Sequence, residues 1–396
     1  MRRWTLLAAV VAAALSAAGC GGGGARVTVE RTAPRVIRVE GTQEHASADL
    51  GFPALATKNT TRIGGADPVA NAAGVARAVF PATDRATRPR AVALLDARDW
   101  RGAVAGAVLA ARPVHAAVLL SDGRELPPAS AEALTALAPR GARRAGGAQL
   151  IRVGDVARPA GVRTADVAGR DPFALARALD AFSAAARGSA SRRVLVTSAE
   201  DPAFAMPAAA WAAKSGDPVL FVTRAGIPAE TRAALAAHGR PRIYVLGPKR
   251  AVAPRVVRAL RKLGTVTRIA GPDPERNAIS FARYLDNGMG WGLVDPGHGL
   301  VFARADAPLA AAAAAPLSAS GTYGPLLLVP DADALGAPLR GFLLDIQPGF
   351  RSDPVRGVYN HGWIVGDDRA ISVATQGQID ALLEIRAVAE SRRAGP

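Results

Sequence analysis

The segment Gly65-Ala66-Asp67-Pro68 begins an alanine-rich helical pattern, and the same Gly-x-Asp-Pro pattern occurs twice more along the chain. The second copy is Gly169-Arg170-Asp171-Pro172, and the third is Gly271-Pro272-Asp273-Pro274. Aspartate is a favoured N-cap, and proline fits the first helical position, where its missing N–H costs nothing. We therefore predict that a helix begins at each of the three prolines. The three aspartates lie 104 and then 102 residues apart, which is one domain length rather than the period of a solenoid.

Each predicted helix is followed by apolar runs that alternate with further helical patterns. The first runs cover 91–95, 194–197 and 300–303, and the second runs cover 117–121, 218–223 and 325–329. Each copy then closes on a short strand that leads into a glycine, which is Gly154, Gly247 or Gly366. Continuous apolar strands that alternate with helices are typical of parallel sheets covered on both faces. The sequence thus predicts an α/β fold of three similar parallel-sheet modules.

Three segments carry a resemblance to a known family. They are Thr61-Arg62-Ile63-Gly64-Gly65, Thr267-Arg268-Ile269-Ala270-Gly271 and Gly366-Asp367-Asp368-Arg369-Ala370-Ile371-Ser372. With the order of the other motifs, 61–385 resembles the cell wall-binding repeat 2 family, which is usually found as three tandem modules. The resemblance implies modules in a pseudo-threefold arrangement that bind anionic wall polymers non-covalently. One departure is that the acidic residue of the family's second helix is missing from all three copies.

The repeats also divide the chain. We expect a lipoprotein signal peptide at 1–20, a tether and lead-in segment at 21–60, modules at 61–159, 160–263 and 264–385, and a tail at 386–396. First helices and closing strands can be exchanged between neighbouring modules, so the boundaries are approximate.

The N-terminus resembles an export signal. Arg2 and Arg3 precede an apolar run that is too short, at about 22 Å as a helix, to span a bilayer core of about 30 Å. The ending Leu15-Ser16-Ala17-Ala18-Gly19-Cys20 resembles a bacterial lipobox, although Ala17 stands where leucine is usual. This predicts an acylated Cys20 and an extracytoplasmic, membrane-anchored, cell wall-associated protein. The alternative is plain secretion after cleavage near Ala18.

Charge and cysteine content restrict the possible partners. The chain has 49 basic and 33 acidic residues, a net charge of +16, and only four lysines, so arginine carries almost all of the positive charge. Export removes nucleic acid as a partner, and the few aromatic residues do not favour base stacking. Anionic wall polymers, peptidoglycan and acidic lipid headgroups remain. The single cysteine excludes an internal disulfide and a four-cysteine zinc site.

The candidate polymer-binding residues are basic. Arg62, Arg268 and Arg276 are carried over from the Arg-Ile-Gly region of the family that the chain resembles. A second group is proposed on electrostatic grounds alone, because it follows one helical face at three-residue steps and guanidinium suits phosphate or carboxylate. This group is Arg255, Arg258, Arg261 and Lys262.

One segment resembles part of an enzyme. Leu293-Val294-Asp295-Pro296-Gly297-His298-Gly299 resembles the first zinc-ligand segment of N-acetylmuramoyl-L-alanine amidases. That family also needs a glutamate ligand, a second histidine and a further glutamate as general base. No glutamate occurs between Glu275 and Glu384, and the only later histidine is His361. No nucleophile elbow, His-Glu-x-x-His motif or P-loop is present. We therefore expect no catalytic residues, no metal site and no cofactor.

These patterns favour a non-catalytic, membrane-tethered envelope protein that binds an anionic wall polymer through three repeat modules. An extracytoplasmic solute-binding lipoprotein is the main alternative, but two closing lobes predict twofold rather than threefold similarity. A zinc-dependent peptidoglycan amidase is a further alternative, and a structural envelope protein without a ligand is another.

Overall fold

The computed structural model describes residues 54–320 and 324–388. The predicted signal peptide and Cys20 lie outside the described residues, as do most of the lead-in segment and of the tail. The last residues of the lead-in segment form strand β1 (Ala54–Ala56) and the first residue of β2 (Thr60–Ile63). Among the described residues, none of the helices combines the length and apolar character that crossing a membrane requires.

The three Asp-Pro pairs begin helices, as the sequence predicts. These helices are α2 (Pro68–Val79), α5 (Pro172–Arg187) and α9 (Pro274–Arg283). The Asp67 carboxylate accepts a hydrogen bond from the backbone N–H of Ala70, and Asp171 and Asp273 cap their helices in the same way. Each aspartate satisfies N–H groups that have no partner within the helix. The prediction of three equivalent helix starts is therefore confirmed.

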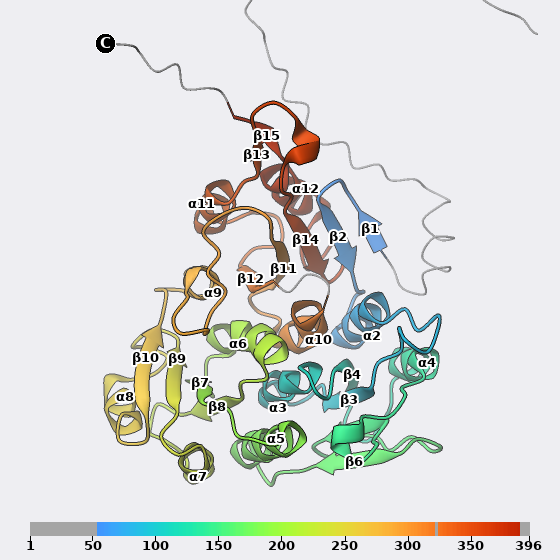
Figure 1. The fold of residues 1–396 in the computed structure, drawn as a ribbon, viewed down its shortest axis with the longest axis vertical. Coiled ribbons are helices and arrows are strands. Elements are labelled where there is room, and N and C mark those ends of the chain that lie inside the picture. Colours follow the sequence, from blue (N-terminus) through green and yellow to red (C-terminus); the bar gives the residue numbers. More distant parts are fainter. Residues whose placement is uncertain (1–53, 321–323, 389–396) are drawn as a thin grey trace, which may run out of the picture. The chain divides into compact units, whose positions relative to one another are not determined.

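The strands form three main sheets, and Figure 1 shows them along the chain. The first has the order β4-β3-β5-β6, with β3 (Ala91–Asp96), β4 (Ala116–Ser121), β5 (Leu150–Val153) and β6 (Thr164–Val167). The second has the order β10-β9-β7-β8, with β7 (Arg193–Ser198), β8 (Val219–Val222), β9 (Arg242–Leu246) and β10 (Thr265–Ile269). The third has the order β1-β2-β14-β11-β12, with β11 (Gly299–Arg304), β12 (Leu326–Val329) and β14 (His361–Val365).

All pairings in these three sheets are parallel except β1 with β2. The α/β class with parallel sheets is therefore confirmed. The remaining helices are α3 (Trp100–Gly106), α4 (Pro128–Leu137), α6 (Pro202–Ser215), α7 (Ala229–Ala237), α8 (Pro254–Leu260), α10 (Pro308–Ala319), α11 (Ala337–Asp345) and α12 (Val373–Leu383). Short elements are the 3₁₀ turns Ala107–Ala110, Arg143–Ala145 and Pro354–Arg356, and the strand pair β13 (Gly349–Phe350) and β15 (Arg386–Ala387).

Each sheet contains a strand that belongs, by sequence, to the next repeat. β6 and β10 precede the helices of the second and third repeats, yet they pair with β5 and β9 of the preceding sheet. The corresponding strand of the first repeat is β2, and it pairs with β14 in the third sheet. Thr60 lies opposite Gly362, and Ile63 lies opposite Val365. The first repeat thus supplies a strand to the last one.

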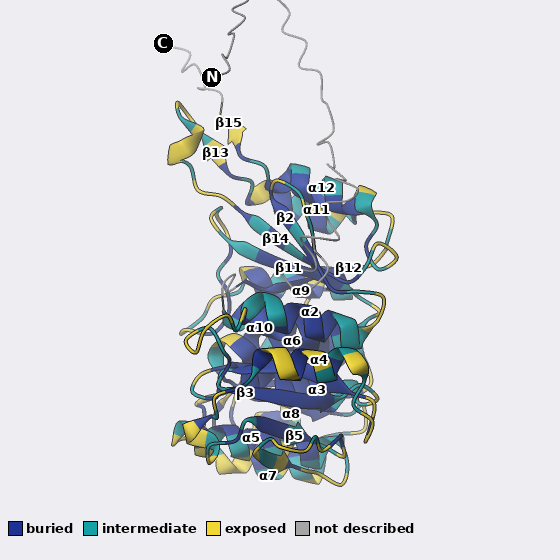
Figure 2. Ribbon diagram, turned by 90° about the vertical axis from the view of Figure 1, so that its right-hand side faces the viewer, coloured by how far each residue is buried: buried dark blue, intermediate teal, exposed yellow. Residues whose placement is uncertain are grey.

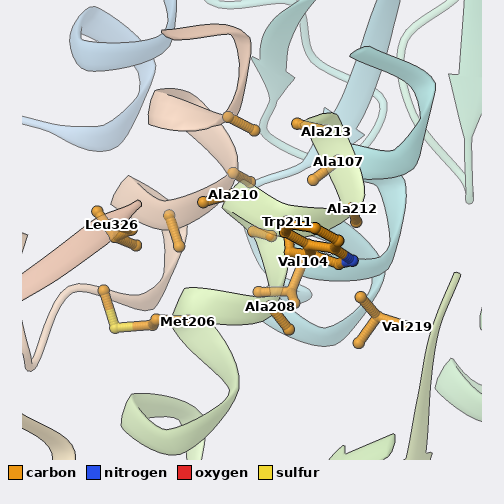
Figure 3. Packing of buried hydrophobic residues seen from close by; sticks show 14 of the residues in the cluster. Val104, Ala107, Met206, Ala208, Ala210, Trp211, Ala212, Ala213, Val219 and Leu326 are labelled. Atoms are coloured by element: carbon orange, nitrogen blue, oxygen red, sulfur yellow. The ribbon is translucent and has the colours of Figure 1, made fainter. Parts of the chain in front are cut away.

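The helices that contact one another between the sheets are rich in alanine. α10 packs against both α6 and α2, and α3 packs against α6 and α10. The α10 side chains from Ala310 to Ala315 are almost fully buried, and small side chains allow helices to approach closely. Trp211 of α6 lies close to Val104 of α3 (Figure 3), and its Nε1 donates to buried Asp217 at 2.9 Å. Figure 2 shows β3 in dark blue and exposed residues on α4 and α7 in yellow.

The alanine-rich contacts lead to a stability prediction. Replacing fully buried Ala313 with leucine (Ala313→Leu) adds three carbons where α10 meets its neighbours, and such overpacking costs about 1–3 kcal/mol. Ala185→Leu makes the same change on an exposed position of α5 and should alter stability by less than about 0.5 kcal/mol. Urea unfolding of both variants measures the difference. Equal stability of the two would show that α10 is loosely packed.

Candidate functional site

Arg62 is directed into the protein. Its side chain lies on β2, only 7% of the residue is exposed, and it makes four hydrogen bonds. Its Nε donates to Gln376 Oε1 at 2.9 Å, and its Nη atoms donate to the carbonyls of Gly366, Asp367 and Ile371 at 2.6–2.9 Å. Burial lowers the pKa of Arg62 below the ordinary value, and the nearby carboxylates of Asp368 and Asp367 partly oppose this. The guanidinium therefore holds the turn after β14.

Arg268 makes the corresponding contacts in the second sheet. It lies on β10 and is half-buried, and burial lowers its pKa. Its Nη1 donates to the carbonyl of Gly247 at 2.5 Å, and its Nη2 donates to the carbonyl of Val252 at 2.6 Å. These carbonyls belong to the turn that follows β9. We call this arrangement, an arginine that holds the turn after the closing strand, an arginine clamp.

The first sheet has an arginine clamp on the other strand of the pair. Arg152 of β5 donates from Nε to the carbonyl of Ala157 at 2.8 Å and from Nη2 to that of Val156 at 2.5 Å. Asp166 lies opposite Arg152 on β6, at the position that Arg62 and Arg268 occupy in their sheets, and it accepts from Arg152 Nη1 at 2.8 Å. Partial burial raises the pKa of Asp166, but the hydrogen bonds from Arg158 and Arg152 lower it by more. The pKa of Asp166 is therefore below its usual value.

A glycine begins each of the clamped turns. Gly154, Gly247 and Gly366 follow β5, β9 and β14 with φ of 81°, 121° and 112°. These left-handed conformations are easily adopted only by glycine. They turn the chain so that the following carbonyl groups face the arginine. The glycine and the arginine together explain why the strand-to-glycine pattern recurs.

The other predicted residues are exposed. Arg276 lies in the first turn of α9, where its Nη1 pairs with Asp273 at 2.5 Å. Arg255 lies on α8 and donates to the carbonyl of Arg224 at 2.6 Å. Within the described residues, Arg258, Arg261 and Lys262 have exposed side chains and form no salt bridge. The structure keeps these four residues together at α8. It does not unite them with Arg62, which belongs to the third sheet.

The segment 293–299 forms a loop that Asn360 holds. Asn360 is almost fully buried, and its Oδ1 accepts from the backbone N–H groups of Gly297 and His298 at 2.8 and 2.9 Å. The Asn360 side chain donates in turn to the carbonyl of Ile346 at 2.7 Å. His298 Nε2 lies 3.1 Å from Asp295 Oδ1. In the part of the chain that the structure describes, no three His, Cys, Asp or Glu side chains are grouped to hold a metal.

The comparisons with known proteins concern the fold. No protein-family model and no curated protein matches the chain. Among solved structures it is similar to Cwp8 from Clostridium difficile, with a TM-score of 0.63 and 18% identity, over 86% of this chain and 54% of that one. It is also similar to Cwp6 from Clostridium difficile, with a TM-score of 0.62 and 14% identity, over 81% of this chain and 48% of that one. The chain therefore shares their fold and spans about half of their length.

The arginine clamp predicts a large loss of stability when Arg62 is replaced and a small change when Arg276 is replaced. Arg62→Met leaves buried carbonyls and the Gln376 amide without their donor, which should lower the free energy of unfolding by about 3 kcal/mol. Arg276→Met removes an exposed i, i+3 pair and should change it by less than about 0.5 kcal/mol. Thermal or urea unfolding compares the two. An Arg62→Met protein as stable as Arg276→Met would refute a structural role for Arg62.

A double-mutant cycle tests whether the clamp of the first sheet, with Arg152 on β5 and Asp166 on β6, is equivalent to the clamp of the second sheet. Arg152→Val copies Val245, the residue opposite Arg268, and Asp166→Arg copies Arg268. Each single change leaves an unpaired partner, so both should destabilise the protein. The double change rebuilds the arrangement of the second sheet, and we expect a favourable coupling of about 1–3 kcal/mol in unfolding measurements. Additive losses would mean that the two clamp geometries are not equivalent.

Proposed function

We propose that this protein is a non-catalytic component of a bacterial cell envelope that binds an anionic polymer of the cell wall. The fold supports the proposal first, because 86% of the chain matches Cwp8, and Cwp8 and Cwp6 are cell wall proteins. The net charge of +16 supports it second, since a basic protein attracts anionic polymers. The third support is the export signal that the sequence predicts at 1–20.

The proposed binding surface follows from the side chains that remain free. Arg62 and Arg268 are engaged in arginine clamps, and Arg276 is paired with Asp273. The exposed group at α8 has no carboxylate partner among the described residues. Arg255 gives one donor to the carbonyl of Arg224, and the other guanidinium and ammonium donors of the group remain for a ligand. We therefore assign polymer binding to Arg255, Arg258, Arg261 and Lys262 and not to the buried arginines of the motif.

Membrane tethering is a separate part of the proposal. Cys20 would carry the acyl group, and the glycines that follow it would separate the folded part from the bilayer. Two or more acyl chains on one residue hold a protein stably to a membrane, whereas one does not. A protein tethered in this way and bound to a wall polymer would connect the membrane with the wall.

Binding to purified cell walls tests this function. The full chain in mild detergent is incubated with walls before and after chemical removal of their phosphate- or uronate-bearing polymers. We expect retention on untreated walls only, with a decrease as the Debye length falls from about 10 Å at 0.1 M salt to about 3 Å at 1 M. Arg258→Gln/Arg261→Gln should reduce retention at 0.1 M, whereas Arg276→Gln, whose side chain is paired, serves as the exposed control.

Two outcomes would contradict the proposal. Equal retention on stripped walls would reject an anionic polymer as the ligand. Release of soluble peptidoglycan fragments during the incubation would show catalysis and would favour the amidase alternative.

A further inference from the structure

A cavity at one end of the first sheet is lined mainly by arginine. Its volume is about 810 Å³, and the residues that line it are Arg85, Arg90, Pro113, Arg140, Gly141, Arg143 and Arg144. They come from three connections, which lead into β3, β4 and β5. The cavity therefore lies at the amino ends of these parallel strands, away from the arginine clamp that follows β5.

The positive charge of this cavity is not neutralised by the described part of the protein. None of its lining residues is acidic, and no described carboxylate forms a salt bridge with any of the five arginines. Asp84 is adjacent in sequence, but its Oδ1 accepts from the backbone N–H groups of Ala86 and Thr87. Other arginines of the same module are paired, for example Arg124 with Asp155. Five like charges around one cavity repel one another unless an anion enters it.

The pKa of a histidine near the cavity is affected by the charges of the same arginines. Burial, together with the charges of Arg112, Arg90 and Arg140, lowers the pKa of His115 to about 4. The two cavity arginines, Arg90 and Arg140, thus oppose a further positive charge nearby. This observation is independent of the shape of the cavity.

Hydrogen bonds hold the three connections that carry these arginines in place. Gly141 N–H donates to the carbonyl of Arg90 at 2.8 Å, which joins two of the three connections. Ala142 and Ala148 form a bridge that closes the turn containing Arg143 and Arg144. Arg90 Nη1 donates to the carbonyl of Pro113 at 2.8 Å, which fixes the third connection. A preformed arrangement lowers the entropy cost of binding.

We propose that this cavity binds a segment of polymer that carries closely spaced phosphate groups. Guanidinium groups bind phosphate oxygens in pairs, and several of them around one concave site match several anionic groups rather than a single ion. The volume exceeds what one phosphate fills. The concave shape favours a flexible chain over a flat membrane surface. This inference names a binding site for the proposed wall attachment, and it rests on that function only for the source of the polymer.

Calorimetry with a soluble probe tests the site without cell walls. The full chain in mild detergent is titrated with tripolyphosphate at 0.1 M salt, and we expect saturable binding with one site. Arg143→Gln/Arg144→Gln removes two exposed lining residues and should weaken Kd roughly tenfold or more. Arg192→Gln/Arg232→Gln removes the same charge from exposed positions outside the cavity and should change Kd by less than about twofold. Urea unfolding confirms that both variants are folded.

Three results would overturn the inference. One is the absence of saturable binding to tripolyphosphate, and another is an equal loss of affinity in the two double variants. The third is a preference for a probe of other chemistry, either an oligouronate, which would make the ligand a carboxylate, or phosphatidylglycerol vesicles, which would make it a membrane. Failure of tripolyphosphate binding with normal retention on untreated walls would reject the cavity and leave the proposed function intact. Normal tripolyphosphate binding without retention on walls would support the cavity and reject the proposed function.

Discussion

The parallel pairing of β2 with β14 is the constraint on which the three-sheet arrangement depends. Thr60 and Gly362 are 302 residues apart, yet they lie opposite each other, and the other two sheets make the same pairing between neighbours in sequence. Because every sheet takes a strand from the next repeat, no repeat contains all the strands of its own sheet. The helices make the same connection, since α10 of the last repeat packs against α2 of the first.

The arginine clamps connect the paired strands with the turns that follow them. A closing strand ends at a glycine with positive φ, the chain turns, and a guanidinium satisfies carbonyl groups that would otherwise be buried without donors. In the first sheet the guanidinium comes from the closing strand itself, so the turn needs a guanidinium donor but not one from a particular strand. Arg152 supplies it from β5, and Asp166 then occupies the usual arginine position on β6 and pairs with it.

The helix starts and the positions of the apolar strands could be predicted from the sequence, because capping and apolar runs are local signals, whereas the order of the strands in each sheet could not. The Asp-Pro pairs at Asp67, Asp171 and Asp273 each fix a helix start without help from distant residues. The role of Arg62 was not accessible, because its acceptors lie about 300 residues away in the chain. A motif identifies an arginine, but only the fold shows whether its guanidinium faces a carbonyl group or solvent.

This distinction changes how a basic protein of this kind can bind a polymer. Two equivalent sites would follow if the repeated Arg-Ile motif bound the ligand, but both arginines of that motif are engaged inside the protein. Among the described residues, the arginines without a carboxylate partner instead include groups at α8, after β9, and at the cavity before β3 and β5. These positions are not equivalent in the repeat. Multivalent attachment would then come from unlike basic sites on one folded protein, which raises avidity without requiring threefold symmetry in the ligand.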